Sequence, residues 1–595
     1  MPATGTGGGA GVRWSLDALF ATADDARTHT ESALGDAKSF AERWSGRLAD
    51  LDGATFAEAL AEVADLRAAR QEAEYYHYLA ESTDSENAET RDLGAWLEPR
   101  LTEIGNVIRA FELEWIGLPA DTAEGLVASP AVTGEAHALS KLRRSVPYTL
   151  SEPEERLLNE RDVTALKAWQ TLFNRHVSTL AADFDSGSGA EPHTVSQLTS
   201  FLGYPDRDLR GRANAALREL VVPEQPLLAQ CYDTIVADRL LVDRLRGYPE
   251  PMLPTHLENE LEADAVLAML DAVEAAYPLA QRWLRVKARC LDLGVLSFSD
   301  IRAPLGDPQP ILWAEAVELA TEAFARVSPE LAATARAFFD AQRVDAEPRR
   351  GKYGGAYCAG LSVRTPAYLF LNYADQLTDV LTLAHELGHG THYIASQIQS
   401  QNSWESGLAL VEVPSTFAEL MLVDHMTAVR GSDDVSFALN AAVLDEVIGA
   451  VYRQTVFVRY EQRAYGLRGE GVVLTPERLG EIMSEEFGKL HGDAVVAELD
   501  DPLWTWARIP HFIDTRFYTY AYVFAFLVAF AAHARMRELP DFSDRYLRFL
   551  AFGGSASPAE QLAELGIDLA DPGIWSEAFS EIERRVQAME ALTAA

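Results

Sequence analysis

The motif HELGH at residues 385–389 combines two imidazoles and one carboxylate at a spacing that suits metal chemistry. On an α-helix, residues four apart lie one turn above each other on the same face, so His385 and His389 can both reach one ion. Glu386 lies beside the open coordination position, where its carboxylate can take the proton of a zinc-bound water. Leu383 and its apolar neighbours indicate a buried helix, and a buried polar cluster needs a partner. The motif therefore predicts a zinc site rather than two histidines on a helix surface.

A catalytic zinc ion needs a third protein ligand, and two glutamates downstream qualify. Glu412 lies 27 positions beyond His385, and Glu419 follows seven residues later on about the same helical face. From spacing alone, either glutamate can bind the zinc ion, and the other can then orient an imidazole that binds it. His392 lies two turns beyond His385 and is too far along the helix to join the same ion, so we expect it to pack or hydrogen-bond around the site.

The elements that position this motif are predicted to be mainly α-helical. Apolar residues recur at helical spacing, as in Phe56, Leu60 and Val63, and similar segments run from about residue 15 to 345. One region departs from this pattern: residues 351–373 are rich in glycine and then in β-forming residues, which predicts a small hairpin or sheet. The metal-binding helix follows directly, with Asp375 or Thr378 as its expected N-terminal cap.

The polar segment from Asp185 to Pro192 is the clearest break in composition. It divides the chain into an N-terminal helical region, residues 1–190, and a catalytic region, residues 191–595, both expected to be parts of one enclosing body. A surface loop at this position is the alternative interpretation.

Composition excludes several classes of protein. The 595 residues include 51 basic and 90 acidic side chains, and the net charge of −39 disfavours binding to nucleic acid. The three cysteines are far apart, so no disulfide framework is expected. The chain shows no apolar signal segment, and its most apolar stretch, from Tyr518 to Ala532, is too short to span a membrane and is expected to be a buried helix. We therefore expect a cytoplasmic protein without a membrane partner; its oligomeric state is left open.

Several segments together resemble the oligoendopeptidase F branch of the thimet oligopeptidase family of zinc metallopeptidases. HELGHGTH at 385–392 matches that family's HExGHxxH pattern, and VEVPST at 411–416 matches its segment with the glutamate ligand. WSLDALF at 14–20, TLSEPEERLL at 149–158 and the stretch 366–390 are also similar to family segments. The resemblance covers nearly the whole chain and is densest from about 350 to 525.

The resemblance implies a role for particular residues. It assigns Glu412 as the third zinc ligand and leaves Glu419 to orient a ligand. It also implies a C-terminal cluster that binds the substrate carbonyl, and a glycine-rich loop, Gly354, Gly355 and Tyr357, that borders the active site. The carbonyl-binding candidates are His511, Tyr518, Tyr520 and Tyr522. A donor at this position stabilises the developing oxyanion. The implied fold is an elongated helical body with one zinc ion deep in a channel that admits unfolded peptides.

The expected function is therefore a zinc-dependent endopeptidase that hydrolyses internal bonds of short oligopeptides. In this interpretation a zinc-bound water attacks the peptide carbonyl while Glu386 acts as general base. A carboxypeptidase or dipeptidyl carboxypeptidase on a related fold is the first alternative; it would need a cation such as Arg508 or Arg516 for the terminal carboxylate. A non-catalytic peptide-binding protein is the second alternative, and the presence of Glu386 argues against it.

Overall fold

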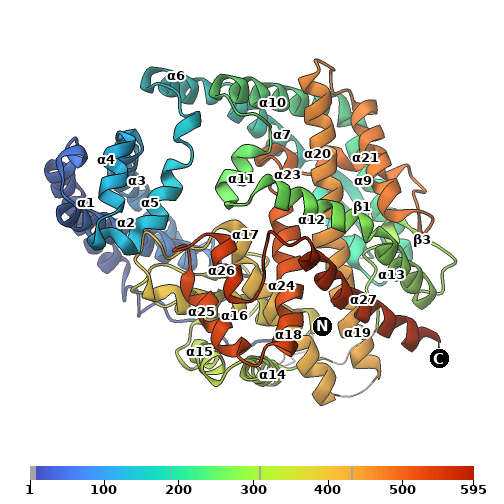
Figure 1. The fold of residues 1–595 in the computed structure, drawn as a ribbon. Coiled ribbons are helices and arrows are strands. Elements are labelled where there is room, and N and C mark those ends of the chain that lie inside the picture. The colour runs from blue at the N-terminus through green and yellow to red at the C-terminus, as the bar shows by residue number, and fades with distance from the viewer. Residues whose placement is uncertain (1–7, 188, 307–309, 431–432, 595) are drawn as a thin grey trace. The chain divides into compact units, whose positions relative to one another are not determined.

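The computed structural model describes residues 8–187, 189–306, 310–430 and 433–594. Within these ranges helices dominate, and strands form only three small sheets (Figure 1). The prediction of a mainly α fold is confirmed. The deep channel implied by the family stays a prediction.

The chain folds into two compact units that interleave along the sequence. The first consists of Met1–Val146, Pro308–Gly431 and Ala532–Leu569, and the second of Pro147–Asp307, Ser432–Ala531 and Ala570–Ala595. Segments far apart in sequence therefore complete each unit. The division into 1–190 and 191–595 stays a prediction, because compactness alone does not identify parts that fold independently.

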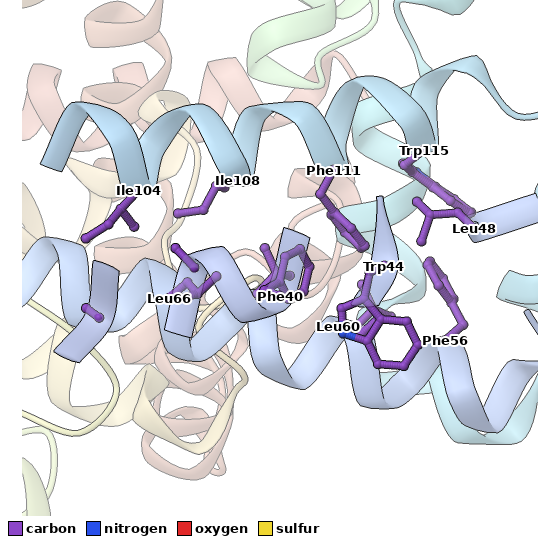
Figure 2. Close-up of a cluster of buried hydrophobic side chains, with 14 of the residues drawn as sticks. Phe40, Trp44, Leu48, Phe56, Leu60, Leu66, Ile104, Ile108, Phe111 and Trp115 are labelled. Carbon is purple, nitrogen blue, oxygen red and sulfur yellow. The ribbon is translucent and has the colours of Figure 1, made fainter. Parts of the chain in front are cut away.

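Three long N-terminal helices pack around an apolar cluster of the first unit: α1 (Ala23–Trp44), α2 (Gly53–Thr83) and α3 (Ala88–Gly117). Figure 2 shows side chains from these helices meeting in this cluster. Phe56 of α2 stacks on Trp115 of α3, with ring centroids 5.2 Å apart. Phe56, Leu60 and Val63 are all buried, as their spacing predicts.

The first unit also contains a three-stranded sheet. Strand β6 (Tyr368–Phe370) lies in the middle, parallel to β4 (Val344–Asp345) and antiparallel to β5 (Tyr357–Ala359). This confirms the predicted sheet beside the helix that carries residues 385–389. The remaining helices of the unit are α4 (Ala120–Val127), α5 (Ala136–Arg143), α14 (Trp313–Ala325), α15 (Pro329–Asp340), α16 (Leu377–Ala395), α17 (Leu408–Val411), α18 (Val413–Arg430), α25 (Phe542–Phe552) and α26 (Pro558–Glu564).

Helix α16 begins differently from the sequence-based expectation. Gln376 is the N-cap, and the Asp379 carboxylate accepts hydrogen bonds from the backbone N–H groups of Gln376 (3.0 Å) and Ala374 (2.7 Å). Asp375 adopts a left-handed conformation (φ 62°) just before the helix, and Thr378 lies inside it. The prediction of Asp375 or Thr378 as the cap was wrong, because the carboxylate three residues into the helix satisfies the free donors instead.

The second unit contains two further small sheets and most of the remaining helices. Strands β1 (Ala181–Asp185) and β2 (Ala190–Thr194) pair antiparallel, so the predicted composition break begins in one strand and ends in the other; residue 188 lies outside the described residues. Strands β3 (Leu296–Ser297) and β7 (Val495–Val496) pair in parallel. The helices are α6 (Glu152–Asp162), α7 (Leu166–Thr179), α8 (Val195–Ser200), α9 (Arg207–Val221), α10 (Gln225–Arg246), α11 (Leu253–Asn259), α12 (Ala263–Ala275), α13 (Tyr277–Cys290), α19 (Asp433–Val447), α20 (Arg453–Gly469), α21 (Pro476–His491), α22 (Asp501–Thr505), α23 (His511–Asp514), most of α24 (Tyr520–Glu538) and α27 (Gly573–Ala594).

The apolar stretch that ends at Ala532 lies mostly in α24, where all its side chains except Tyr522 are buried. Among the described residues, one run, Asp434–Gly469, is long and apolar enough to cross a membrane by length and composition. In the most apolar 18-residue part of this run, 61% is buried inside the structure, which is typical of a helix in a protein core. A five-residue π-helix, Ile448–Tyr452, interrupts this run between α19 and α20.

Candidate metal centre

The donor atoms of His385, His389 and Glu412 face one another within the first unit. The two Nε2 atoms lie 3.2 Å apart, and Glu412 Oε2 lies 3.3 Å from His385 Nε2 and 3.4 Å from His389 Nε2. The three atoms thus form a nearly equilateral triangle with one donor from each residue. The two histidines come from one face of α16, as the spacing predicts.

Close contact between α16 and α18 positions Glu412. A Cβ atom on Gly388 would lie 2.6 Å from both the Pro414 carbonyl oxygen and the Ser415 Cα, so only glycine allows this approach. Glu412 itself sits between α17 and α18, where Ser415 Oγ donates a hydrogen bond to its carboxylate at 3.1 Å. The glycine inside the histidine motif therefore determines how near the third donor comes.

Glu419 contacts the other nitrogen of the His385 ring. Its Oε1 lies 2.6 Å from His385 Nδ1, on the side of the ring away from Glu412. A carboxylate in this position accepts a hydrogen bond from the Nδ1–H group and fixes the tautomer that leaves Nε2 free for a metal. The two glutamates that spacing left equivalent are thus in different positions, and only Glu412 joins the donor triangle.

The electrostatics of the cluster follow from its burial. Burial would disfavour the charged form of Glu412, but hydrogen bonds with His385 and His389 outweigh it and hold its pKa below the usual range. Burial also opposes the charge of His385, and contacts with Glu412 and Glu419 raise its pKa above the usual value. Glu386 lies outside the donor triangle and is buried, and burial raises its pKa.

His392 is buried on α16 but does not join the donor triangle. Its Nε2 lies 3.1 Å from Ser406 Oγ, and its ring stacks on Phe549 of α25 with centroids 6.3 Å apart. Burial lowers its pKa to about 3, so the ring is neutral near neutral pH. This placement agrees with the expected packing role.

The glycine-rich loop is fixed by contacts within the first unit. Gly355 has φ +82°, and its carbonyl oxygen accepts a hydrogen bond from Asn372 Nδ2 at 2.9 Å. The Tyr357 hydroxyl lies 2.6 Å from Ser82 Oγ of α2, and its ring stacks on Phe370 with centroids 4.8 Å apart. Gly354, by contrast, has open space where a Cβ would be. None of these three residues supplies an atom to the donor triangle.

Cys358, which the sequence predicts to be a small packed residue, lies near Glu386. Burial raises the pKa of its thiol, and the nearby Glu386 carboxylate adds to the increase. Successive residues of a strand point to opposite faces, so Tyr357 and Cys358 cannot face the same side of β5. Tyr357 was selected as a candidate because of its side-chain type. The alternation of side chains along the strand was the signal that could have pointed to Cys358 as a neighbour of Glu386.

His511 and the three candidate tyrosines belong to the second unit. The His511 ring stacks on Tyr518, with centroids 5.6 Å apart, and the hydroxyls of Tyr518 and Tyr522 are in contact. The Tyr520 hydroxyl instead contacts His256 Nδ1 (3.1 Å) and accepts a hydrogen bond from Asn259 Nδ2 (3.3 Å) in the core of that unit. The structure therefore groups three of the four residues and separates Tyr520 from them.

Comparisons with known proteins place this site in a family. The model of peptidase family M3 matches residues 323–581, and the model of the oligopeptidase F N-terminal region matches residues 114–181. Together the two matches cover more than half of the chain. The chain belongs to peptidase family M3. Its resemblance to the oligoendopeptidase F branch is confirmed, and the chain is a peptidase.

Individual relatives align along almost the full length. The group B oligopeptidase PepB of Streptococcus agalactiae is 26% identical over 602 residues, covering 98% of this chain and 97% of that protein. An oligoendopeptidase F homologue of Borreliella burgdorferi is 23% identical and covers 94% of each chain. Among solved structures, a peptidase from Chlamydophila abortus has a TM-score of 0.86 at 22% identity, with 98% of each chain covered. Oligoendopeptidase F from Enterococcus faecium has a TM-score of 0.70 at 21% identity, covering 96% of this chain and 98% of that one. These structural matches support the shared fold.

Membership of family M3 also implies a metal-dependent oligopeptidase, and the donor triangle fits that requirement. Motif 385–392 lies inside the matched region, as do Glu412 and Glu419. His511 and its tyrosine neighbours lie in the same region.

Proposed function

We propose that this protein is a zinc-dependent endopeptidase that cleaves internal bonds of short, unfolded oligopeptides. In this proposal His385, His389 and Glu412 hold the zinc ion, Glu419 orients His385, and Glu386 acts as general base. The donor triangle is the observation that carries the proposal, because it joins two imidazoles and one carboxylate within hydrogen-bonding distances.

The size of the triangle supports zinc as the metal. In a tetrahedral site with bonds of about 2.05 Å, neighbouring ligand atoms lie about 3.3 Å apart. The three distances here are 3.2, 3.3 and 3.4 Å. Three protein donors leave the fourth position of a tetrahedron for a reactant, as in catalytic rather than structural zinc sites. When bound, a zinc ion supplies Lewis-acid chemistry: it makes water more acidic and polarises a carbonyl group.

Glu386 is proposed to move the proton. It directly follows His385 on α16 and is not part of the donor triangle, so its carboxylate is available for acid–base chemistry. It accepts a proton from the attacking water and delivers it to the amine of the leaving peptide. No acyl-enzyme forms, so no nucleophilic side chain is needed.

His511, Tyr518 and Tyr522 are proposed to donate hydrogen bonds to the carbonyl oxygen as it gains negative charge. His511 Nδ1 is buried and has no hydrogen-bond partner among the described residues, so it can serve a ligand. Tyr520 was included with these residues on the family resemblance. Its hydroxyl is already held by His256 and Asn259, which favours a packing role.

The loop of Gly354, Gly355 and Tyr357 is proposed to border the bound peptide. Contacts with Ser82 and Asn372 hold the loop in place, which favours a preformed wall over a moving lid. Relatives named oligoendopeptidase support short peptides as the substrate class. A cytoplasmic location and the absence of nucleic-acid and membrane partners remain predictions from the sequence.

A carboxypeptidase-type activity is the second candidate, and one observation bears on it. Of the two arginines suggested for binding a terminal carboxylate, Arg516 is held by Asp243 at 2.6 and 2.8 Å. Arg508 forms no hydrogen bond with a carboxylate among the described residues, so its guanidinium could bind a terminal carboxylate.

The test uses an internally quenched peptide blocked at both ends, with products identified by mass spectrometry. The chelator-treated protein should be inactive, and zinc should restore cleavage at an internal bond. Cleavage only of peptides with a free C-terminus would replace the endopeptidase by the carboxypeptidase. Binding of the peptide without any cleavage by the zinc-loaded protein would contradict both and favour a non-catalytic peptide-binding protein.

A further inference from the structure

The chain reverses its direction between His511 and Tyr518, two of the residues proposed to bind the substrate carbonyl. Six residues separate them in the sequence, yet their rings stack with centroids 5.6 Å apart. His511 begins the short helix α23, and Tyr518 lies two positions before the start of α24. The backbone of residues 512–517, the connecting segment, therefore determines how the two rings lie.

The first half of the connecting segment is held by its carbonyl groups. Arg239 of α10 is buried and donates to three successive carbonyl oxygens, those of Phe512 (3.2 Å), Ile513 (2.7 Å) and Asp514 (3.1 Å). Gln170 of α7 donates to the Ile513 carbonyl at 2.8 Å and to the Asp514 carbonyl at 3.1 Å. The end of a helix leaves carbonyl groups without helical partners, and these two side chains supply the donors.

The second half of the connecting segment turns at Phe517. Its φ of 53° is left-handed, a conformation that is costly for a bulky residue and persists only where the surroundings enforce it. Phe517 is buried, and its backbone N–H donates to Glu461 Oε2 at 3.0 Å. The carbonyl oxygen of the same peptide unit, from Arg516, accepts a hydrogen bond from Thr255 Oγ1 at 3.0 Å. This peptide unit is therefore held on both sides.

Glu461 is a fully buried residue of α20 with few polar contacts of its own. Its Oε1 atom is buried and has no hydrogen-bond partner among the described residues. Burial raises the pKa of Glu461 to about 8, although the hydrogen bond from Phe517 and the charges of Arg239 and Arg516 oppose the rise. A buried carboxylate that lacks full pairing is costly. Stability alone therefore does not explain why a glutamate occupies this position.

A second buried glutamate of the same unit shows the usual arrangement. Glu486 of α21 is also fully buried, and its carboxylate accepts hydrogen bonds from Arg463 Nη1 at 2.9 Å and from Lys489 Nζ at 2.8 and 2.9 Å. Cations thus offset the cost of burying Glu486. The closest polar contact of Glu461 in the described part of the chain is instead a backbone N–H group in the turn before Tyr518.

We propose that Glu461 is a positioning residue that, by accepting the Phe517 N–H, holds Tyr518 against His511 so that both can donate to the substrate carbonyl. This inference rests on the proposed function of His511 and Tyr518. Tyr518 directly follows Phe517, so a rotation of the peptide unit before Phe517 would carry the phenol away from the imidazole. Donors that are fixed before the reaction need no reorganisation while charge develops on the carbonyl oxygen.

Two substitutions separate the acceptor atom from the bulk of the side chain. Glu461→Met keeps a side chain of similar length but removes the acceptor. Glu461→Gln keeps a carbonyl oxygen that can accept the Phe517 N–H. Tyr460→Phe is the matched control, because it removes a buried hydroxyl that has no hydrogen-bond partner among the described residues. The ring that remains at this position stacks on Phe512, with centroids 4.7 Å apart.

The first measurement is kcat and KM of the zinc-loaded proteins on the doubly blocked peptide. Glu461→Met should lower kcat about 10²-fold and leave KM nearly unchanged, because misplaced donors weaken the transition state rather than the binding of substrate. Glu461→Gln should recover most of this loss, and Tyr460→Phe should match the wild type. A wild-type kcat in Glu461→Met, or an equal loss in Glu461→Gln, would overturn the proposal.

Thermal unfolding distinguishes positioning from a purely structural role. Replacement of an incompletely paired buried carboxylate by an apolar side chain should leave Tm unchanged or raise it. Loss of kcat in Glu461→Met at an unchanged or higher Tm therefore supports the proposal. A lower Tm of this variant, combined with a wild-type kcat of the folded protein, would identify Glu461 as structural and contradict it.

Amide hydrogen exchange followed by mass spectrometry tests the same contact without catalysis. Peptides that contain residues 511–522 should exchange about tenfold faster in Glu461→Met than in the wild type, because the Phe517 N–H loses its acceptor. Glu461→Gln and Tyr460→Phe should exchange at the wild-type rate. Equal exchange in Glu461→Met and the wild type would overturn the positioning role. A wild type that does not cleave the peptide would instead overturn the proposed function, and the exchange rates would still report whether Glu461 holds this segment.

Discussion

Glu419 and Glu412 contact opposite nitrogens of the same ring: Glu419 Oε1 lies 2.6 Å from His385 Nδ1, and Glu412 Oε2 lies 3.3 Å from Nε2. The first contact fixes the ring, and the second completes the donor triangle. Their different positions lead to different expected effects of mutation.

Glu419→Ala should weaken metal binding without abolishing it. Loss of a carboxylate that orients a ligating histidine typically costs about 10–100-fold in metal affinity. Competition with a chromophoric chelator measures this change. Glu322→Ala is the matched control, because Glu322 also contacts a histidine of the first unit, His425 at 3.0 Å, but lies outside the donor triangle. Equal metal affinity of Glu419→Ala and the control would contradict the assigned role.

Gly388→Ala should damage both stability and metal binding. The added methyl would lie 2.6 Å from backbone atoms of Pro414 and Ser415, so α18 must shift and take Glu412 with it. Overpacking of this kind costs about 1–3 kcal/mol. Gly35→Ala on α1 is the control, since no atom lies within 4 Å of its Cβ position. Thermal unfolding with and without zinc should show a loss only for Gly388→Ala, and a wild-type zinc affinity in that variant would refute the packing argument.

His491 should make the second unit sensitive to acid. Burial lowers its pKa to about 4 from 6.5, so the folded protein keeps the ring neutral while the unfolded chain protonates it. Stability is therefore lost as the pH falls below 6.5, and by about 2 kcal/mol at pH 5. His491→Phe removes this proton uptake and should reduce the difference in Tm between pH 7 and pH 5. The ring already stacks on Phe487, which makes phenylalanine a suitable replacement. An unchanged pH dependence would show that other groups dominate acid unfolding.

The net charge of −39 should influence the choice of substrate. Acidic side chains near the bound peptide attract cationic peptides and repel anionic ones, and salt screens both effects. The ratio of kcat/KM for an Arg-rich peptide to that for a Glu-rich peptide of equal length should exceed one at low salt and fall as sodium chloride is added. A ratio of one at every salt concentration would show that the net charge has no influence on which peptide is cleaved.

Sequence patterns predicted the features that depend on local geometry. The spacing of His385 and His389 determines one face of a helix, and the β-forming run at 366–373 predicted the neighbouring sheet. The distinction between Glu412 and Glu419 depends on how two helices approach. Spacing could not decide it, because Gly388 acts through contacts with residues distant in the sequence.

Other features could not be predicted because tertiary contacts determine them. The Tyr520 hydroxyl contacts His256 and Asn259, which lie more than 250 positions earlier in the sequence, whereas Tyr518 contacts His511 and Tyr522. The interleaving of the two units is also invisible in composition, because each unit uses segments from both halves of the chain. The unpaired state of Arg508 likewise became apparent only when its neighbours were known.

The central claim is that His385, His389 and Glu412 hold zinc while Glu386 transfers the proton. The most direct test is the kcat of zinc-loaded Glu386→Gln on the doubly blocked peptide, with metal content measured on the same sample. We expect one zinc ion per chain in both wild type and variant, and a fall in kcat of roughly 10²–10⁴-fold. Full activity in Glu386→Gln, or loss of the zinc ion with the activity, would contradict the account.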